Sequence, residues 1–200
     1  MLTLTSVPVD HELFTAARFH DAMWMHHRVM GLFGDLGSSS AARSEGAVLF
    51  RYEPWVGEGR VLVQSAADPV VEGVRSTALT PVLEQLTKGA RVRFLLHANA
   101  VRTVNRTGED GKTRTHRADV PEEQREQWLL DRTVSFFTDV AVQDPEVSSS
   151  RLGRKAKLLT VSFTGTATVT DPQALAETVR AGVGRGKAYG CGLLTVAPLP

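Results

Sequence analysis

The fold is decided near the end of the chain, by Gly182-Val-Gly-Arg-Gly-Lys-Ala-Tyr-Gly-Cys-Gly-Leu-Leu-Thr-Val-Ala-Pro198. A helical pattern over residues 171–180 precedes this stretch, and its apolar end, residues 193–197, is typical of a strand. Glycine permits positive φ and a close approach of a ligand to the backbone. Backbone N–H groups, together with Arg185 and Lys187, would then line an anion site. The other interpretation is a plain helix C-cap and turn. In both cases the turn is shaped by Gly182, Gly184, Gly186, Gly190 and Gly192.

Known nucleotide-binding motifs do not fit this stretch. A Walker loop requires Ser or Thr after its lysine, but Ala188 follows Lys187. A dinucleotide-binding loop lies between a strand and the helix that it opens, whereas these glycines follow a helix. The sequence therefore predicts no cofactor.

The glycine-rich stretch closely resembles the C-terminal loop of the CasE family, the CRISPR repeat-RNA endonucleases of type I-E systems. Three further segments agree with that family in order and spacing. Met25-His-His-Arg-Val-Met-Gly-Leu-Phe33 resembles its "LHxxVMxLF" helix, and Val61-Leu-Val-Gln-Ser65 resembles its "VLLQS" strand. Val92-Arg-Phe-Leu-Leu-His-Ala-Asn-Ala100 resembles its "FRLRANP" strand, with His97 and Ala100 in place of Arg and Pro. The resemblance covers essentially the whole chain.

The resemblance implies an α+β fold of two tandem ferredoxin-like (RRM-like) βαββαβ domains. Residues 1–90 would carry the catalytic helix, and residues 91–200 the basic hairpin and the glycine-rich loop. The residue patterning is compatible with this fold, although the first half lacks a clean second helix. Residues 106–119 are expected to form a polar loop, and residues 157–170 a strand that pairs with the polar segment before it. Further strands are expected at 1–9, 47–52, 59–65 and 91–104, and helices from the cap Asp10 to Phe33, from Pro121 to about Phe137, and over 171–180.

The composition is that of a chain with a sizeable core, at 42% hydrophobic and 22% charged residues. A single cysteine, Cys191, excludes an intrachain disulfide and fits a reducing compartment. No signal-peptide pattern opens the sequence, and no apolar run is long enough to span a membrane. We therefore expect a cytoplasmic protein without a membrane partner.

Cations are concentrated in the second half, although the formal net charge is only +1. No acidic residue interrupts the cluster at residues 151–157, and such cations repel one another unless a polyanion is present. A basic hairpin at this point would fit the groove of an RNA stem. For the cluster at residues 102–117 a solvated loop is the alternative. The predicted RNA-binding residues are Arg102, Arg151, Arg154, Lys155, Lys157, Arg185 and Lys187. The resemblance implies that the RNA is the CRISPR repeat stem-loop and that the protein partners are the other subunits of a type I-E Cascade complex.

His26 is the candidate catalytic residue. On a helix it falls within an apolar arc formed with Phe19, Met23, Met30 and Phe33, with Ala22, Met25 and Val29 beside it, so the residues alone also allow a core histidine. Matching "LHxxVMxLF" without gaps implies that His26 is catalytic, with His27 as the rival if the register slips by one. RNA can be cut by its own 2′-OH, which must lose a proton while the leaving 5′-oxygen gains one. Histidine suits either transfer near neutral pH. His27 and Arg28 are candidates to support the step by offsetting the charge of the phosphorane.

One position departs from the family. Its better-known members carry a tyrosine three residues before the histidine, where this chain has Met23, which cannot transfer a proton. His27, His20 or an arginine are the candidates for that role. The histidines lack metal-ligand spacing and Cys191 has no partner cysteine, so no metal site is predicted.

The principal hypothesis is a metal-independent endoribonuclease that cuts CRISPR precursor RNA at the repeat stem-loop. Attack by the 2′-OH would leave a 2′,3′-cyclic phosphate, and the mature guide RNA would stay bound. The first alternative is a non-catalytic subunit of the same complex that binds the repeat hairpin, an interpretation favoured by Met23. A small-molecule phosphate-binding enzyme, resting on the glycine-rich stretch alone, is the second.

Overall fold

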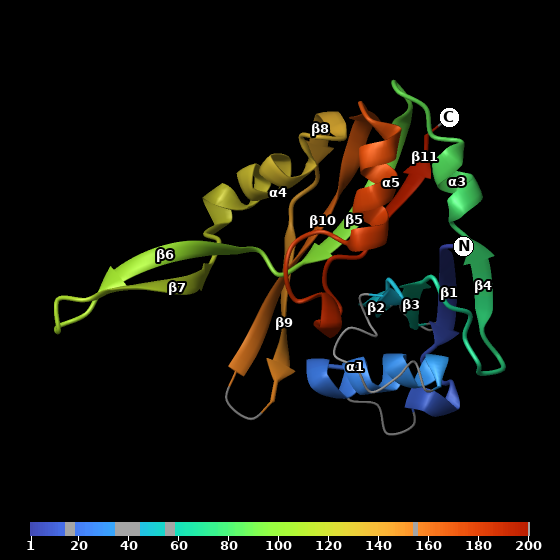
Figure 1. Cartoon of the computed structure of the whole chain (residues 1–200), viewed down its shortest axis with the longest axis horizontal. Coiled ribbons are helices and arrows are strands. Elements are labelled where there is room, and N and C mark those ends of the chain that lie inside the picture. Colours follow the sequence, from blue (N-terminus) through green and yellow to red (C-terminus); the bar gives the residue numbers. More distant parts are fainter. Residues whose placement is uncertain (15–18, 35–44, 55–58, 154–155, 200) are drawn as a thin grey trace.

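The first half of the chain forms a four-stranded antiparallel sheet with one helix packed on it (Figure 1). The computed structural model describes every residue except 15–18, 35–44, 55–58, 154–155 and 200. The strand order is β2-β3-β1-β4. Val61 and Val63 of β3 form a core with Met25 and Val29 of α1, whereas Leu62 packs on the opposite side with Leu193. The elements are β1 (Thr3–Pro8), α1 (Ala22–Met30), β2 (Leu49–Glu53), β3 (Arg60–Ser65) and β4 (Arg75–Ala78).

The second half contains an antiparallel sheet in the order β11-β5-β10-β8, with β9 also paired to β10. Buried Val92, Phe94 and Leu96 alternate along β5 with exposed Arg91 and Arg93, so one face of the sheet is apolar. Two helices, α4 (Arg125–Thr133) and α5 (Pro172–Ala181), contribute buried residues to the core on that face. The strands are β5 (Arg91–Ala98), β8 (Phe137–Val142), β9 (Glu146–Leu152), β10 (Ala156–Val169) and β11 (Leu194–Pro198).

Both sheets have the ferredoxin-like strand order, and the predicted α+β fold class is confirmed. In the first half β3 is followed by β4 without an intervening helix, and the short helix α3 (Thr80–Glu84) comes after β4. Leu83 and Leu86, at α3, belong to the core of the second half. Residues before 90 therefore contribute to both cores, and the domain boundary between residues 90 and 91 stays a prediction.

A two-stranded hairpin of β6 (Val101–Thr107) and β7 (Thr113–Asp119) extends away from both sheets (Figure 1). The expected polar loop at residues 106–119 and the continuous strand at 91–104 are therefore wrong. Most side chains on both strands are exposed, so the hairpin lacks the apolar–polar alternation by which a half-buried strand is recognised.

The helices begin and end at points that differ from those expected. The helix predicted to start at Asp10 is wrong, because a single 3-10 turn, η1 (Glu12–Phe14), follows β1. Helix α1 starts after Asp21, whose carboxylate accepts hydrogen bonds from the N–H groups of Met23 and Trp24 at 3.1 and 3.0 Å. It continues into a second 3-10 turn, η2 (Gly31–Phe33). The helix predicted from Pro121 is divided into η3 (Glu122–Gln124) and α4. None of the helices in the described ranges is long and apolar enough to cross a membrane.

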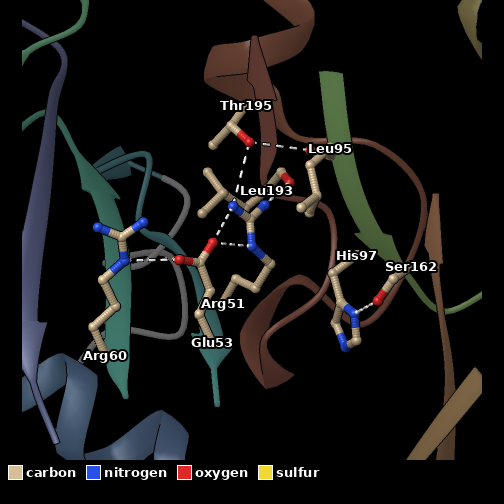
Figure 2. Close-up of polar contacts among 8 residues, drawn as sticks. All are labelled: Arg51, Glu53, Arg60, Leu95, His97, Ser162, Leu193 and Thr195. Atoms are coloured by element: carbon tan, nitrogen blue, oxygen red, sulfur yellow. Dashed lines mark hydrogen bonds and ion pairs between the residues drawn. The ribbon is translucent and has the colours of Figure 1, made fainter. Parts of the chain in front are cut away.

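A buried ion pair joins the two halves (Figure 2). Arg51 and Glu53 of β2 lie 2.6 Å apart, and Arg60 of β3 binds the second carboxylate oxygen at 2.8 Å. Arg51 also donates to the carbonyl of Leu193 and to the hydroxyl of Thr195, both at 3.3 Å. Burial would raise the pKa of Glu53, but the hydrogen bonds and charges of the two arginines outweigh it and lower that pKa. The carboxylate thus stays ionised where the C-terminal strand meets the first sheet.

Candidate functional site

His26 is half-buried at the edge of the packed face of α1. The buried residues of this helix are Ala22, Met25 and Val29, whereas Met23 is 42% exposed. The predicted apolar arc is confirmed for Phe33, which is buried, and for Phe19 and Met30, which pack against the same core. It is wrong for Met23, because the buried line of α1 runs through Ala22, Met25 and Val29 beside it. A packed helix therefore holds the backbone of His26 while its side chain lies at the border of the core.

Tyr189, from the second half of the chain, packs against His26. The two ring centroids lie 6.3 Å apart with the planes at 68°, an edge-to-face arrangement. Tyr189 belongs to the 3-10 turn η4 (Lys187–Tyr189), inside the glycine-rich stretch. The sequence contained no local signal for this contact, because the two residues lie at opposite ends of the chain.

His27 and Arg28, the predicted supporting residues, are exposed on α1. The ring centroid of His27 lies 5.6 Å from that of His26. The guanidinium carbon of Arg28 lies 5.1 Å from the ring centroid of Trp24, one turn earlier on the same helix. Both side chains therefore stand on the exposed side of α1, near His26 in sequence and in space.

The β9–β10 hairpin is attached to the start of α1. The N–H of Arg151 donates to the carbonyl of His20 at 2.6 Å, directly before the cap residue of the helix. Arg151 and Lys157 are exposed and stand opposite each other on the paired strands. Arg154 and Lys155 lie outside the described residues. The hairpin predicted from the charge cluster is present, and it places Arg151 beside the helix that carries His26.

Met23 lies at the turn of this hairpin. A Cβ atom added to Gly153 would lie 3.6 Å from its sulfur. The thioether of Met23 therefore lies close to Gly153, which directly follows β9.

The glycine-rich stretch is folded back on itself. The N–H of Val183 donates to the carbonyl of Gly192 at 2.9 Å, and the N–H of Gly192 donates to the carbonyl of His97 at 2.7 Å. A Cβ atom at Gly192 would lie 2.8 Å from the carbonyl oxygen of Val183, so a side chain would clash there as well as strain the backbone. Positive φ angles between 72° and 87° are found at Gly182, Gly184, Gly186, Gly190 and Gly192.

The two cations of this stretch have different surroundings. The amino group of Lys187 donates to the carbonyl of Ala181 at 2.7 Å, at the end of α5, so RNA would have to compete with that contact. Arg185 is exposed and pairs through its backbone with Asn99. Arg185 and Arg102 line a common cavity of about 650 Å³ together with Arg117 and Arg132. The structure thus unites the predicted residues Arg102 and Arg185 with Arg117 of the same charge cluster, and it adds Arg132, which the sequence did not indicate.

A second cavity, of about 590 Å³, is lined by residues of both halves, including Ala22 of α1 and Tyr189. His97 lines it, and its Nδ1 lies 2.8 Å from the hydroxyl of Ser162 on β10 (Figure 2). Burial, and to a lesser degree the charge of Arg51, lowers the pKa of His97 to about 4. His97 is therefore neutral at physiological pH. Further aliphatic hydroxyl groups of the lining come from Ser148, Ser149, Ser150, Thr160 and Thr164.

In the described ranges, no group of three or more His, Cys, Asp or Glu residues is placed to hold a metal ion. Cys191 is buried, which raises the pKa of its thiol to about 12 and keeps it protonated.

Two ferredoxin-like halves, with a histidine beside a basic hairpin and a glycine-rich loop, define the class of this protein. The family described as "CRISPR associated protein" matches residues 3–198. The chain belongs to this family.

Two relatives are similar in sequence to this chain over most of its length. The "CRISPR system Cascade subunit CasE" of Escherichia coli K12 is 35% identical over 151 residues, which cover 70% of this chain and 74% of the relative. The "CRISPR-associated endoribonuclease Cse3" of Thermus thermophilus is 31% identical over 182 residues, which cover 80% and 84%.

Solved structures of related proteins have a similar fold over nearly the whole chain. The crystal structure of Cas6e from Escherichia coli K-12 covers 100% of both chains, with a TM-score of 0.71 and 25% identity. Thermus thermophilus Cse3, bound to an RNA representing a pre-cleavage complex, covers 98% of this chain and 99% of its own, with a TM-score of 0.68 and 27% identity.

Proposed function

We propose that this chain is an endoribonuclease that cuts CRISPR precursor RNA at the repeat stem-loop and keeps the mature guide RNA bound. The observation that carries this proposal is the position of His26, on a helix attached to the basic β9–β10 hairpin and in contact with the glycine-rich stretch. A titratable group and phosphate-binding cations are thereby combined in one region. The relatives support the assignment, because one is named as a Cascade subunit and another as an endoribonuclease.

The chemistry fits a histidine without a metal. The 2′-oxygen forms a bond to the adjacent phosphorus, the bond from phosphorus to the 5′-oxygen breaks, and one proton moves from the first oxygen to the second. His26 takes or gives that proton, since an imidazole exchanges protons near neutral pH. The products are a 2′,3′-cyclic phosphate and a 5′-hydroxyl. His27 and Arg28 would supply positive charge near the phosphorane.

The stem would be held by phosphate contacts from exposed cations. Arg151 and Lys157 stand opposite each other on the hairpin next to α1. Arg154 and Lys155, which lie outside the described residues, come between them in the sequence. The cavity shared by Arg102 and Arg185 offers a second group of cations, between the β6–β7 hairpin and the glycine-rich stretch. Such contacts position an RNA without reading its sequence. Lys187 joins them when it leaves the carbonyl of Ala181.

Partners and location complete the proposal. The chain would act in the cytoplasm with the other subunits of a type I-E Cascade complex, and its halves, residues 1–90 and 91–200, would be its two domains. Support comes from the relative named as a Cascade subunit and from the lone, buried cysteine, which requires no oxidising compartment.

The test is an incubation of the protein with repeat-containing RNA in excess EDTA. We expect one cut at the stem-loop and a 5′ fragment that ends in a 2′,3′-cyclic phosphate or the 3′-phosphate formed when it opens. Activity that requires added Mg²⁺ would contradict the mechanism.

A non-catalytic subunit is the second candidate, because Met23 occupies the position of the family tyrosine and cannot transfer a proton. That candidate predicts tight binding of the repeat hairpin and an intact RNA with and without Mg²⁺.

A further inference from the structure

We infer that Tyr189 is a positioning residue for His26, because its ring packs edge-on against the imidazole and fixes the orientation from which the proton is transferred. The inference rests on the proposed function, which gives His26 its task. The contact joins the two halves of the chain, with ring centroids 6.3 Å apart and ring planes at 68°. The active site would then be complete only when the glycine-rich stretch is docked on α1.

The backbone of Tyr189 is fixed by the two glycines beside its turn. Gly186 and Gly190 have φ of 72° and 83°, in the left-handed region, and they bracket η4 on both sides. The N–H of Tyr189 donates to the carbonyl of Gly186 at 2.8 Å. A Cβ atom at Gly190 would lie 3.2 Å from a ring carbon of Phe50, so this end of the turn lies close against β2. The backbone of this short turn is therefore restrained on both sides of Tyr189.

The side chain of Tyr189 is also held. It packs against a small buried cluster to which α1, β10 and the glycine-rich stretch contribute Ala22, Leu158 and Cys191. Leu152 of β9 packs against the same cluster. Tyr189 therefore packs on a cluster that also receives residues from the helix of His26 and from both strands of the basic hairpin. A group placed there can align the imidazole with an RNA that the hairpin holds.

His26 is half-buried and is not one of the buried residues of α1, so a contact from outside the helix can contribute to the orientation of its ring. An edge-to-face pair favours one orientation by about 2- to 10-fold over an aliphatic contact. A small misplacement of a catalytic group can lower a rate by about 100-fold. The ring, rather than the hydroxyl, is assigned the role, since the contact is between the two rings.

The experiment compares Tyr189→Leu, which keeps an apolar side chain against the cluster, with Tyr189→Phe, which keeps the ring. The single-turnover cleavage rate is measured at saturating protein, and the dissociation constant of the repeat hairpin separately. We expect Tyr189→Leu to lower the rate about 10-fold or more and to leave the dissociation constant within about 2-fold. Tyr189→Phe should restore the rate. Tyr52→Phe is the matched control, because Tyr52 stacks on Phe19 at 4.4 Å and should keep the parental rate.

An NMR measurement makes the inference independent of cleavage. The side-chain proton resonances of His26, assigned by their loss in His26→Ala, should shift in Tyr189→Leu and stay near parental values in Tyr189→Phe. If the Leu variant does not fold, Tyr189→Met replaces it.

Three results would overturn the inference: a parental cleavage rate in Tyr189→Leu, an equal loss in Tyr189→Phe, or weaker RNA binding at an unchanged rate. If the parent protein does not cut RNA, the proposed function fails, and the NMR shifts still report whether Tyr189 fixes the imidazole.

Discussion

His26 differs from the other histidines in what surrounds it. A packed helix carries it, an aromatic ring from the other half touches it, and a basic hairpin is hydrogen-bonded to the residue before the helix cap. His97, by contrast, is kept neutral inside a cavity. His97 therefore does not carry a proton at pH 7, because burial favours its neutral form.

Replacing His26 by Ala should abolish cleavage and spare binding. We expect the cleavage rate to fall by about 100- to 10,000-fold, the usual contribution of a general acid or base, with the dissociation constant of the hairpin within about 2-fold. Single-turnover assays and a binding titration measure the two effects. His27→Ala is the comparison. Parental cleavage by His26→Ala together with loss in His27→Ala would move the catalytic role to His27.

His97 should make the fold sensitive to acid. Its pKa is about 4 in the folded chain against 6.5 when unperturbed, so the unfolded state binds more protons between these values. Stability is complete above pH 6.5 and falls as the pH drops towards 4. The loss due to His97 is about 2–3 kcal/mol.

Urea denaturation from pH 7.5 to 4 measures this effect as the difference between the parent and His97→Gln. His116→Gln, exposed on β7, should follow the parent curve. If the free energy of unfolding falls equally with pH in the parent and in His97→Gln, His97 is not the cause of the acid sensitivity.

Among the secondary-structure elements, the β9–β10 hairpin is the one whose charge we expect to contribute most to RNA binding. Replacing Arg151 and Lys157 by Ala should weaken RNA binding and lower the slope of log affinity against log salt concentration by about two, one for each lost phosphate contact. The control has the same charge change elsewhere: Arg75→Ala on β4 with Lys88→Ala before β5. If both double variants lower the salt slope equally, the effect is one of overall charge, and the hairpin is not the RNA contact.

The sequence predicted the elements with strong local signals. The helix over residues 171–180 has a cap, Asp171, which accepts from Ala174 at 3.0 Å, and the glycines after it have the positive φ that their spacing suggested. The β6–β7 hairpin was missed because exposed strands have no apolar alternation. The start of α1 was misplaced because Asp10 and Asp21 both precede apolar residues, and the choice depends on tertiary packing.

The candidate site could be predicted only in part, because some of its contacts form only through tertiary packing. His26 is found from its neighbours in sequence, Val29 and Met30. Its contact with Tyr189, and the grouping of Arg117 and Arg132 with Arg102, arise when distant segments meet in the fold. No local pattern records such contacts.

At the scale of the whole molecule, the ion pair of Arg51 and Glu53 connects the first sheet to the C-terminal strand. Glu53→Gln leaves Arg51 buried beside a neutral group, and we expect a loss of about 3 kcal/mol in the free energy of unfolding. For a chain of this size the melting temperature should fall by roughly 10 °C.

Arg60→Gln is the matched control for Glu53→Gln, because the Arg60 side chain is 43% exposed and its ion pair is worth little. Its melting temperature should stay close to that of the parent. Equal effects of the two substitutions would show that the buried pair does not hold the halves together.

A repeat RNA with a single 2′-deoxy nucleotide just upstream of the cut tests whether the RNA is cut by its own 2′-OH. We expect this RNA to bind with parental affinity and to remain intact in EDTA, while the all-ribose RNA is cut under the same conditions. Cleavage of the deoxy RNA at the same position would contradict this mechanism.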